Sequence, residues 1–163
     1  GGTDFALAFG GNEMAGYHTG PAAYLTNLTG SRHSHLDSAG YALDEKAAKG
    51  ETYSPEGVAS ALLQEERWRQ VLSSLVVCYF ARGVYDGETI RKALAVAGFA
   101  LSAEDLSALG AETLHRKYAF KKRAGFDLVN QRIPKRILET LSPLGQIDEA
   151  FLRRSMELFQ ANI

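Results

Sequence analysis

Two of the four histidines stand two positions apart in the stretch GSRHSHLD, beside an arginine and an aspartate. If this stretch were a strand, its alternate side chains would share a face, and His33 and His35 could bind zinc together. A zinc site needs three or four ligands, however, and His18, Asp37 and Cys78 show no recognisable ligand spacing. His33 could instead act alone as an acid or base, since histidine side chains ordinarily have a pKa of about 6.5, which suits neutral pH. These alternatives, and that of a plain polar loop, stay open on the local residues.

Cys78 is the only cysteine and lies in the apolar stretch LSSLVVCYF. Free cysteines are among the most buried residues, so Cys78 taken alone is predicted to be buried in the last turn of a helix. Nucleophilic catalysis would require a thiolate beside a base, and the neighbouring sequence supplies none. A lone cysteine cannot form an internal disulfide, which favours a reducing cytoplasm.

The composition is that of an ordinary globular protein, with 163 residues, 45% hydrophobic and 23% charged, and a formal net charge of −1. This length suits one domain with a core or two small helical lobes. The near-zero charge argues against a nucleic-acid partner, because phosphate binding needs a basic excess. No apolar run approaches the roughly 20 residues of a membrane span, and no signal peptide is recognised, so no membrane partner is expected.

The first third of the chain is expected to be rich in loops. Alternating apolar residues at 4–9 predict a short strand that ends at Gly10. Residues 16–50 are rich in Gly, Thr, Ser, Asn and His, and although a short helix could form at 21–28, loop backbone is expected to dominate.

Helical signals begin at Ser54, where an N-cap serine is followed by Pro55 and an acidic residue. The predicted helix runs to Cys78, with the polar stretch EERWRQ interrupting its apolar face. Similar start and stop signals predict further helices at 87–97, 102–125 and 134–141. A last helix is predicted after Asp148, where Leu152, Met156 and Phe159 are spaced for burial. The predicted fold class is therefore mostly α, with residues 1–53 as a loop-rich segment and 54–163 as a helical bundle region.

Five basic residues gather near the end of the predicted helix at 102–125, after acidic residues at its start. This order matches the helix dipole, and the cluster is predicted to be a solvated helix face. Its members are Arg116, Lys117, Lys121, Lys122 and Arg123.

Four segments, taken in order, resemble the aldehyde ferredoxin oxidoreductase family. They are FALAFGGNEMAGY, AAYLTNLTGSRHSHLD, LSSLVVCYF, and GAETLHRKYAFKKRAGFD followed by IPKRIL. Departures also occur, since Ser73 stands where the family has an aspartate and Val76 where it has a glycine. The residues that carry the match are Phe5, Gly11, Glu13, Gly16, Tyr17, Tyr24, Thr26, Gly30, His33, Ser74, Leu75, Cys78, Gly110, Glu112, Arg116, Phe120, Arg123, Gly125, Pro134 and Arg136.

The resemblance implies roles for individual residues in the C-terminal helical portion of such an enzyme. His33 corresponds to the histidine beside the metal-oxo centre, where a proton donor or acceptor is useful. Cys78 corresponds to the fourth ligand of a 4Fe-4S cluster, since iron is held there by thiolates. Ser73, Ser74 and Val76 correspond to the segment that borders a pterin.

The same resemblance implies the cofactors and partners. The family holds tungsten, or molybdenum, between two pterins, and oxidises an aldehyde to a carboxylic acid. Electrons leave through the iron–sulfur cluster to ferredoxin. The pterin platform and three further cluster cysteines are expected in an upstream portion or a separate subunit. We therefore expect residues 1–53 to face an active site that is completed elsewhere, and the chain alone to be inactive.

Two other hypotheses remain at this point. The chain could be a non-catalytic helical interaction module of the same ancestry that has lost the cofactor, which the changes at Ser73 and Val76 favour. It could also be an unrelated helical domain whose match is accidental.

Overall fold

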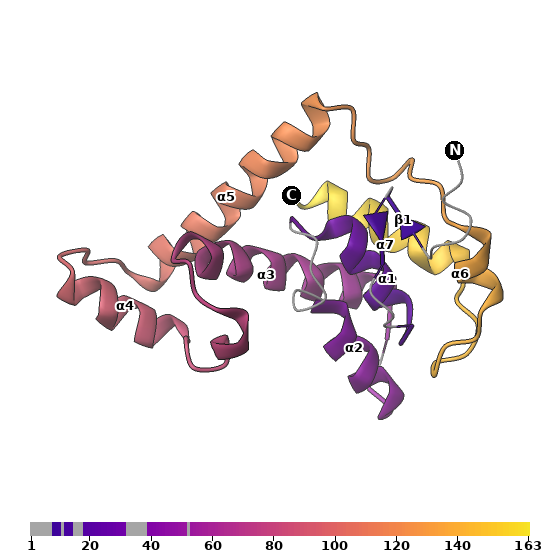
Figure 1. The fold of residues 1–163 in the computed structure, drawn as a ribbon, viewed down its shortest axis with the longest axis horizontal. Helices are drawn as coiled ribbons and strands as arrows, with labels where there is room; N and C mark the ends of the chain where they lie inside the picture. The colour runs from indigo at the N-terminus through magenta and orange to yellow at the C-terminus, as the bar shows by residue number, and fades with distance from the viewer. Residues whose placement is uncertain (1–7, 11, 15–17, 32–38, 52) are drawn as a thin grey trace.

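The computed structural model describes residues 8–10, 12–14, 18–31, 39–51 and 53–163, which form an elongated arrangement of helices around α3 (Figure 1). The predicted mostly α fold class is confirmed, and a single antiparallel strand pair precedes the helices in the described residues. The elements are β1 (Ala8–Phe9), β2 (Asn12–Glu13), α1 (Pro21–Thr29), α2 (Ala39–Ala48), α3 (Pro55–Ser74), the 3-10 turn η2 (Tyr79–Ala81), α4 (Gly87–Val96), α5 (Ala103–Arg123), α6 (Lys135–Glu139) and α7 (Glu149–Ala161).

The helix starts predicted from local capping signals are confirmed. The Gly57 amide donates to Ser54 Oγ at 3.1 Å at the start of α3. A reciprocal capping box joins Ser102 and Asp105 at the start of α5. Each side-chain cap satisfies an amide that the first helical turn leaves without an intrahelical acceptor.

The expectation that loop backbone dominates residues 16–50 is wrong, because α1 and α2 occupy much of this range. The start of α1 carries no local side-chain cap, since its N-cap position is Gly20. Its acceptor comes instead from α2, where Asp44 accepts hydrogen bonds from the amides of Ala22, at 3.1 Å, and Ala23, at 2.9 Å. A cap supplied by a distant helix leaves no signal in the sequence around 21.

Asp44 is buried and forms the centre of the contact between α1 and α2. Its carboxylate also accepts from the hydroxyls of Thr19, at 3.0 Å, and Tyr53. Burial raises the pKa of Asp44 above the ordinary aspartate value, whereas these hydrogen bonds act in the opposite direction. The two helices approach closely at Gly40, where a β-carbon would lie 1.9 Å from the carbonyl oxygen of Ala22.

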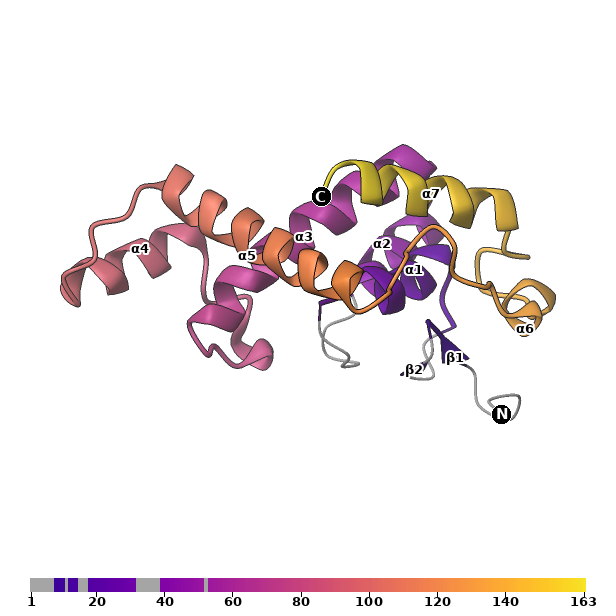
Figure 2. The same cartoon turned by 90° about the horizontal axis from the view of Figure 1, so that it is seen from above.

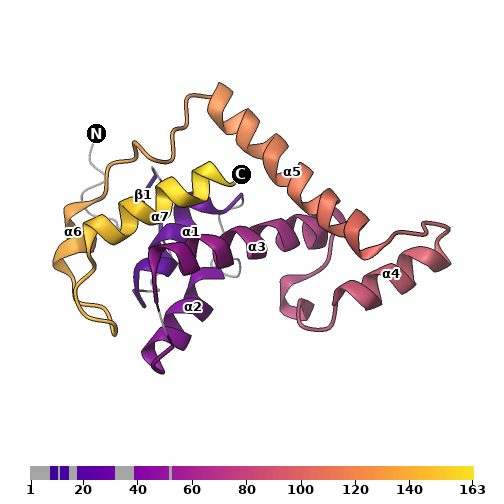
Figure 3. The same cartoon turned by 180° about the vertical axis from the view of Figure 1, so that it is seen from behind.

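Among the described residues, the buried apolar side chains form two separate clusters, and α3 contributes to both. Figure 3 shows α3 running from the region of α1 and α7 toward α4 and α5. The larger cluster lies where α1, the first half of α3 and α7 meet, and it includes the predicted core residues Leu152, Met156 and Phe159. The smaller cluster joins the end of α3 to α4 and the first part of α5. Its buried members are Val71, Leu72, Tyr79, Ile90 and Leu106.

Gly110 allows α5 to cross α3 at close range. A β-carbon at this position would lie 2.3 Å from the backbone oxygen of Arg67 and 3.2 Å from Val71 Cγ2. Because the nearest atom belongs to a helix backbone, it cannot move aside as a flexible side chain would.

Replacing Gly110 with alanine is expected to lower the free energy of unfolding by about 1–3 kcal/mol, despite the better helix propensity of alanine, because the two helices must separate. Chemical denaturation followed by circular dichroism measures the change. Gly83→Ala is the matched control, since nothing lies within 4 Å of its β-carbon position. Equal unfolding midpoints for the two variants would show that the helix crossing does not depend on Gly110.

Candidate functional site

His33, His35 and Asp37 lie outside the described residues, so their predicted roles remain predictions. The structure does describe the three residues at the end of α1, Thr29, Gly30 and Ser31, which lead into that stretch. It also describes the segment around Cys78. The candidate site therefore consists of these two segments and the residues that hold them in place.

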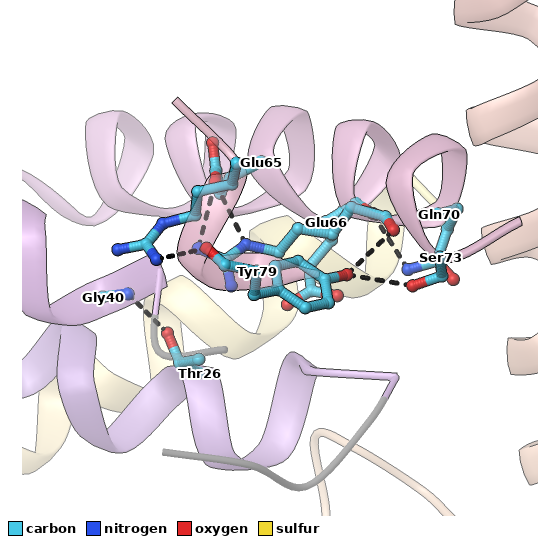
Figure 4. Close-up of polar contacts among 9 residues, drawn as sticks. Thr26, Gly40, Glu65, Glu66, Gln70, Ser73 and Tyr79 are labelled. Atoms are coloured by element: carbon cyan, nitrogen blue, oxygen red, sulfur yellow. Dashed lines mark hydrogen bonds and ion pairs between the residues drawn. The ribbon is translucent and has the colours of Figure 1, made fainter. Parts of the chain in front are cut away.

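A row of buried polar side chains on α3, which we call the polar row, lies between these two segments. Glu66, Arg69 and Gln70 are only 2%, 5% and 1% exposed. Figure 4 shows Glu66 and Gln70 on the same stretch of helix as Ser73 and next to Tyr79. From the sequence, EERWRQ was predicted only to interrupt the apolar face of the helix, and the burial of these polar side chains was not predicted. The spacing of Glu66 and Gln70, four and eight residues after buried Leu62, was the available signal.

The polar row holds the end of α1 from one side. The Ser31 amide donates to Glu66 Oε2 at 3.3 Å, and Gln70 Nε2 donates to Ser31 Oγ at 2.7 Å. Ser31 precedes His33 by two residues, so the polar row fixes the backbone that leads into that histidine.

Helix α5 holds Thr29 and Gly30, the two residues that precede Ser31. Tyr118 Oη donates to the carbonyl oxygen of Thr29 at 2.7 Å, and Lys121 Nζ donates to that of Gly30 at 3.0 Å. Lys121 also lies over the Tyr118 ring, 4.7 Å from its centroid. Burial lowers the pKa of Lys121, although the nearby Glu66 carboxylate raises it.

The prediction that all five basic residues near the end of α5 form a solvated face is wrong for two of them. Lys117 and Lys121 are partly buried because they turn toward α3 and the end of α1. Lys117 Nζ donates to Gln70 Oε1 at 2.7 Å. The remaining three, Arg116, Lys122 and Arg123, are exposed.

The prediction that Cys78 is buried in the last turn of a helix is also wrong. Helix α3 ends at Ser74, and Cys78 is exposed immediately before η2. The helix closes with two bonds, from the Val76 amide to the Ser73 oxygen and from the Val77 amide to the Leu72 oxygen, both at 3.1 Å. This is the hydrogen-bond pattern of a Schellman motif, which turns the chain away before it reaches the cysteine.

Val76 occupies the position of the Schellman motif that glycine usually fills. Its φ of 57° makes it the only non-glycine residue with positive φ in the described chain. A β-branched side chain is strained in this left-handed conformation. By the resemblance, the family has a glycine at the position of Val76. Glycine adopts a positive φ without strain, so it suits the end of a helix at this position.

The segment that carries Cys78 is tied to the polar row through its neighbour Tyr79. Tyr79 Oη donates to the carbonyl oxygen of Arg69 at 3.0 Å and shares a 2.9 Å hydrogen bond with Ser73 Oγ (Figure 4). Ser74 Oγ donates to the Gln70 carbonyl oxygen at 2.8 Å. The residues of α3 that hold the end of α1 and the Cys78 segment lie between positions 66 and 73. They therefore span about 10 Å along the helix axis.

The surface around Cys78 carries exposed apolar side chains. Val76 is 90%, Phe80 79% and Val84 68% exposed. Figure 2 shows that the η2 turn and the β1–β2 pair project from the same side of the molecule, opposite α7. The three residues lie within nine positions of one another, and a contiguous apolar surface there would suit contact with other protein.

His18, another residue considered for zinc binding, takes part in a different set of contacts. Its Nε2 forms a hydrogen bond with the Thr140 carbonyl oxygen at 3.1 Å, and its Nδ1 forms one with Tyr24 Oη. Both ring nitrogens are therefore used within the fold. In the described ranges, no group of three or more His, Cys, Asp or Glu residues is placed to hold a metal ion.

Val76→Gly is expected to raise the free energy of unfolding by about 1 kcal/mol, because relief of the left-handed backbone strain exceeds the entropy that glycine adds to the unfolded chain. Val76 is exposed, so its replacement removes no core packing. Urea denaturation of the variant and the parent chain measures the difference.

Val84→Gly is the control for this substitution, since Val84 is also exposed but has no positive φ. It is expected to lower stability by up to about 1 kcal/mol through backbone entropy alone. If Val76→Gly lowers the free energy of unfolding as much as Val84→Gly does, the positive φ of Val76 does not destabilise the chain.

Comparison with known proteins identifies the family of the chain. The family model described as aldehyde ferredoxin oxidoreductase, domains 2 and 3, matches residues 1–160. No curated protein and no solved structure matches the chain significantly. None of the helices in the described residues combines the length and apolar character needed to cross a membrane. Because the family match covers almost the whole sequence, the chain belongs to the aldehyde ferredoxin oxidoreductase family, in the portion formed by the second and third domains.

Proposed function

We propose that the chain is the C-terminal part of an enzyme that oxidises small aldehydes to carboxylic acids and passes the electrons to ferredoxin. One observation carries this proposal. The end of α1, which stops two residues before His33 in the sequence, is anchored to the polar row of α3, and the segment that bears Cys78 is anchored to the same helix through Tyr79. The described chain on one side of His33 and the Cys78 segment are thereby supported by one rigid element.

Cys78 is proposed as one ligand of a 4Fe-4S cluster. A cluster ligand must present its sulfur to iron, and the exposed position of Cys78 fits a cluster that is held largely by other protein. The exposed Val76 and Phe80 beside it would supply an apolar surrounding once covered, and the polarity of that surrounding tunes a cluster's reduction potential. Three further cysteines would have to come from an upstream portion or subunit, since Cys78 is the only one here.

His33 is proposed as the acid/base of the reaction. Oxidation of an aldehyde with water gives a carboxylic acid, two protons and two electrons. The tungsten or molybdenum bis-pterin, when bound, supplies the two-electron redox chemistry. A ring nitrogen of His33 would take up or release a proton as water adds to the carbonyl carbon. The contacts at Thr29–Ser31 support this role, because they fix the described backbone that ends two residues before His33.

Ser73, Ser74 and Val76 are proposed to border the pterin. Ser74 and Val76 are exposed at the end of α3, next to the Cys78 segment, and Ser73 is partly buried. The Ser73 hydroxyl shares its hydrogen bond with Tyr79, so its contribution is to hold that segment in place.

One observation favours the alternative function, a helical interaction module that has lost the cofactor. Ser73 carries no carboxylate where the family has an aspartate, and its hydroxyl contacts Tyr79 within the fold. The exposed apolar surface at Val76, Phe80 and Val84 would serve a protein partner in either function. Metal content separates the two.

The full-length protein, made anaerobically with tungsten supplied, is expected to contain iron and tungsten and to show a 4Fe-4S electron paramagnetic resonance signal after reduction. Cys78→Ser is expected to abolish most of this signal and the aldehyde-oxidising activity, because a hydroxyl is a poor substitute for a thiolate on iron. The free energy of unfolding of the metal-free protein should change little, since the Cys78 side chain is exposed.

Ser60→Ala, at an exposed position of α3 near its other end, is the control and should retain iron, signal and activity. A parent protein that contains neither iron nor tungsten would overturn the enzyme function and leave the interaction module. A Cys78→Ser protein with full cluster signal would overturn the role of Cys78 alone.

A further inference from the structure

A cavity of about 550 Å³ lies at the end of the molecule where α3, α4 and the start of α5 come together (Figure 3). Trp68 lines it from α3, Arg91 from α4 and Ser107 from α5. Its volume falls within the range of about 300–1,000 Å³ that is typical of small-molecule sites. Among the described residues that line it, none has a role in the proposed function.

The Nε atom of Arg91 is buried and has no hydrogen-bond acceptor among the described residues. In the described chain it is the only buried side-chain nitrogen or oxygen atom in this condition. A surface arginine ordinarily lays its apolar stem along the protein and extends its guanidinium into water, where the Nε atom is hydrated. A buried donor without an acceptor costs stability, so its presence in a fold calls for an explanation.

The positive charge of Arg91 is not neutralised within the cavity. Glu88 is the only carboxylate among the described residues that line it, and this carboxylate forms a 2.6 Å ion pair with Lys92 on the same helix. Arg67 also lines the cavity, and its Nη2 donates to the carbonyl oxygen of Asn162 at 2.8 Å. The cavity therefore has a net positive lining, and Arg91 offers it an unused donor.

The remaining lining residues favour an organic anion over an inorganic one. The Trp68 ring lies beside the start of α4, where its Cη2 is 4.0 Å from the β-carbon position of Gly87. Val71 and Leu106 line the same cavity and belong to the smaller apolar cluster. An indole ring and apolar side chains attract the carbon body of a ligand, whereas they offer no hydrogen bond to a hydrated inorganic ion.

We propose that this cavity binds a small organic carboxylate. The Arg91 guanidinium holds the carboxylate through Nε and one Nη atom, in the bidentate geometry that arginine forms with this group. The Trp68 ring contacts the apolar body of the ligand. Because Val71 and Leu106 belong to the cavity wall and to the smaller apolar cluster, the bound ligand stabilises the packing of α4 against α5.

Benzoate is the probe for this site, since it joins a carboxylate to a planar apolar ring. Isothermal titration calorimetry of the full-length protein is expected to give a dissociation constant on the order of 1 mM or lower. Benzamide has nearly the same shape without the charge, and acetate has the charge without the ring. Each should bind about tenfold more weakly than benzoate, or weaker still. Benzoate should also slow amide hydrogen exchange in peptides from α4.

Arg91→Met separates a binding role from a structural one. It keeps an apolar stem and removes the donors, so benzoate should bind about tenfold more weakly or not at all. Without benzoate, the variant should unfold at the same temperature as the parent protein or at a higher one, because a buried unpaired donor is removed. Arg132→Met is the matched control, since Arg132 is exposed in the loop before α6, and it should bind benzoate as the parent does.

Trp68→Phe locates the binding event within the protein. Trp68 is the only tryptophan of the 163 residues, so the part of the tryptophan emission that benzoate changes through this cavity should be absent from the variant. The same emission change in Trp68→Phe and the parent would place the benzoate elsewhere and overturn the site.

Three further results would overturn the proposal. They are no benzoate binding by the parent protein, equal binding by the parent and Arg91→Met, and a lower unfolding temperature of Arg91→Met, which would make Arg91 a structural residue. Acetate binding as strong as that of benzoate would overturn the organic class of the ligand. All of these outcomes are independent of the iron and tungsten content, which tests the proposed function.

Discussion

The burial of three polar side chains on one face of α3 constrains much of the remaining structure. Glu66, Arg69 and Gln70 need hydrogen-bonding partners because an unpaired buried polar group is costly. Groups at the end of α1 pair with Glu66 and Gln70, Lys117 of α5 pairs with Gln70, and Glu65 pairs with the Arg69 guanidinium. Two segments distant in sequence, the end of α1 and α5, therefore converge on one helix, and their relative positions follow from its geometry.

The features that could be predicted from sequence are those whose cause lies within a few residues. Ser54 and Ser102 cap the helices that follow them, and both starts are as predicted. The apolar spacing around Leu152 and Met156 likewise predicted burial in α7. The ordered family segments also predicted the family that the comparison with known proteins found.

The features that could not be predicted depend on partners far along the chain. Helix α1 is capped by Asp44, which stands more than twenty positions away from the amides that it accepts from. Cys78 is flanked by apolar residues, so local composition predicted burial, but the Schellman motif at Val76 directs the following segment outward. The partners of Lys117 and Lys121 lie on α3 and at the end of α1, so periodicity along α5 alone could not distinguish them from solvated lysines.

The buried apolar side chains are divided between a larger and a smaller cluster. This division affects how the proposed iron–sulfur centre could be inserted at Cys78. The smaller one contains only five buried side chains, including Tyr79 next to Cys78. Regions with few buried contacts open at lower free energy than the main core, so the thiol-bearing turn can open while the packing of α1 and α7 persists. If Cys78 is a cluster ligand as proposed, binding of iron to the closed form would stabilise that form by linkage, and maturation of the iron–sulfur centre would be coupled to tightening of the smaller apolar cluster.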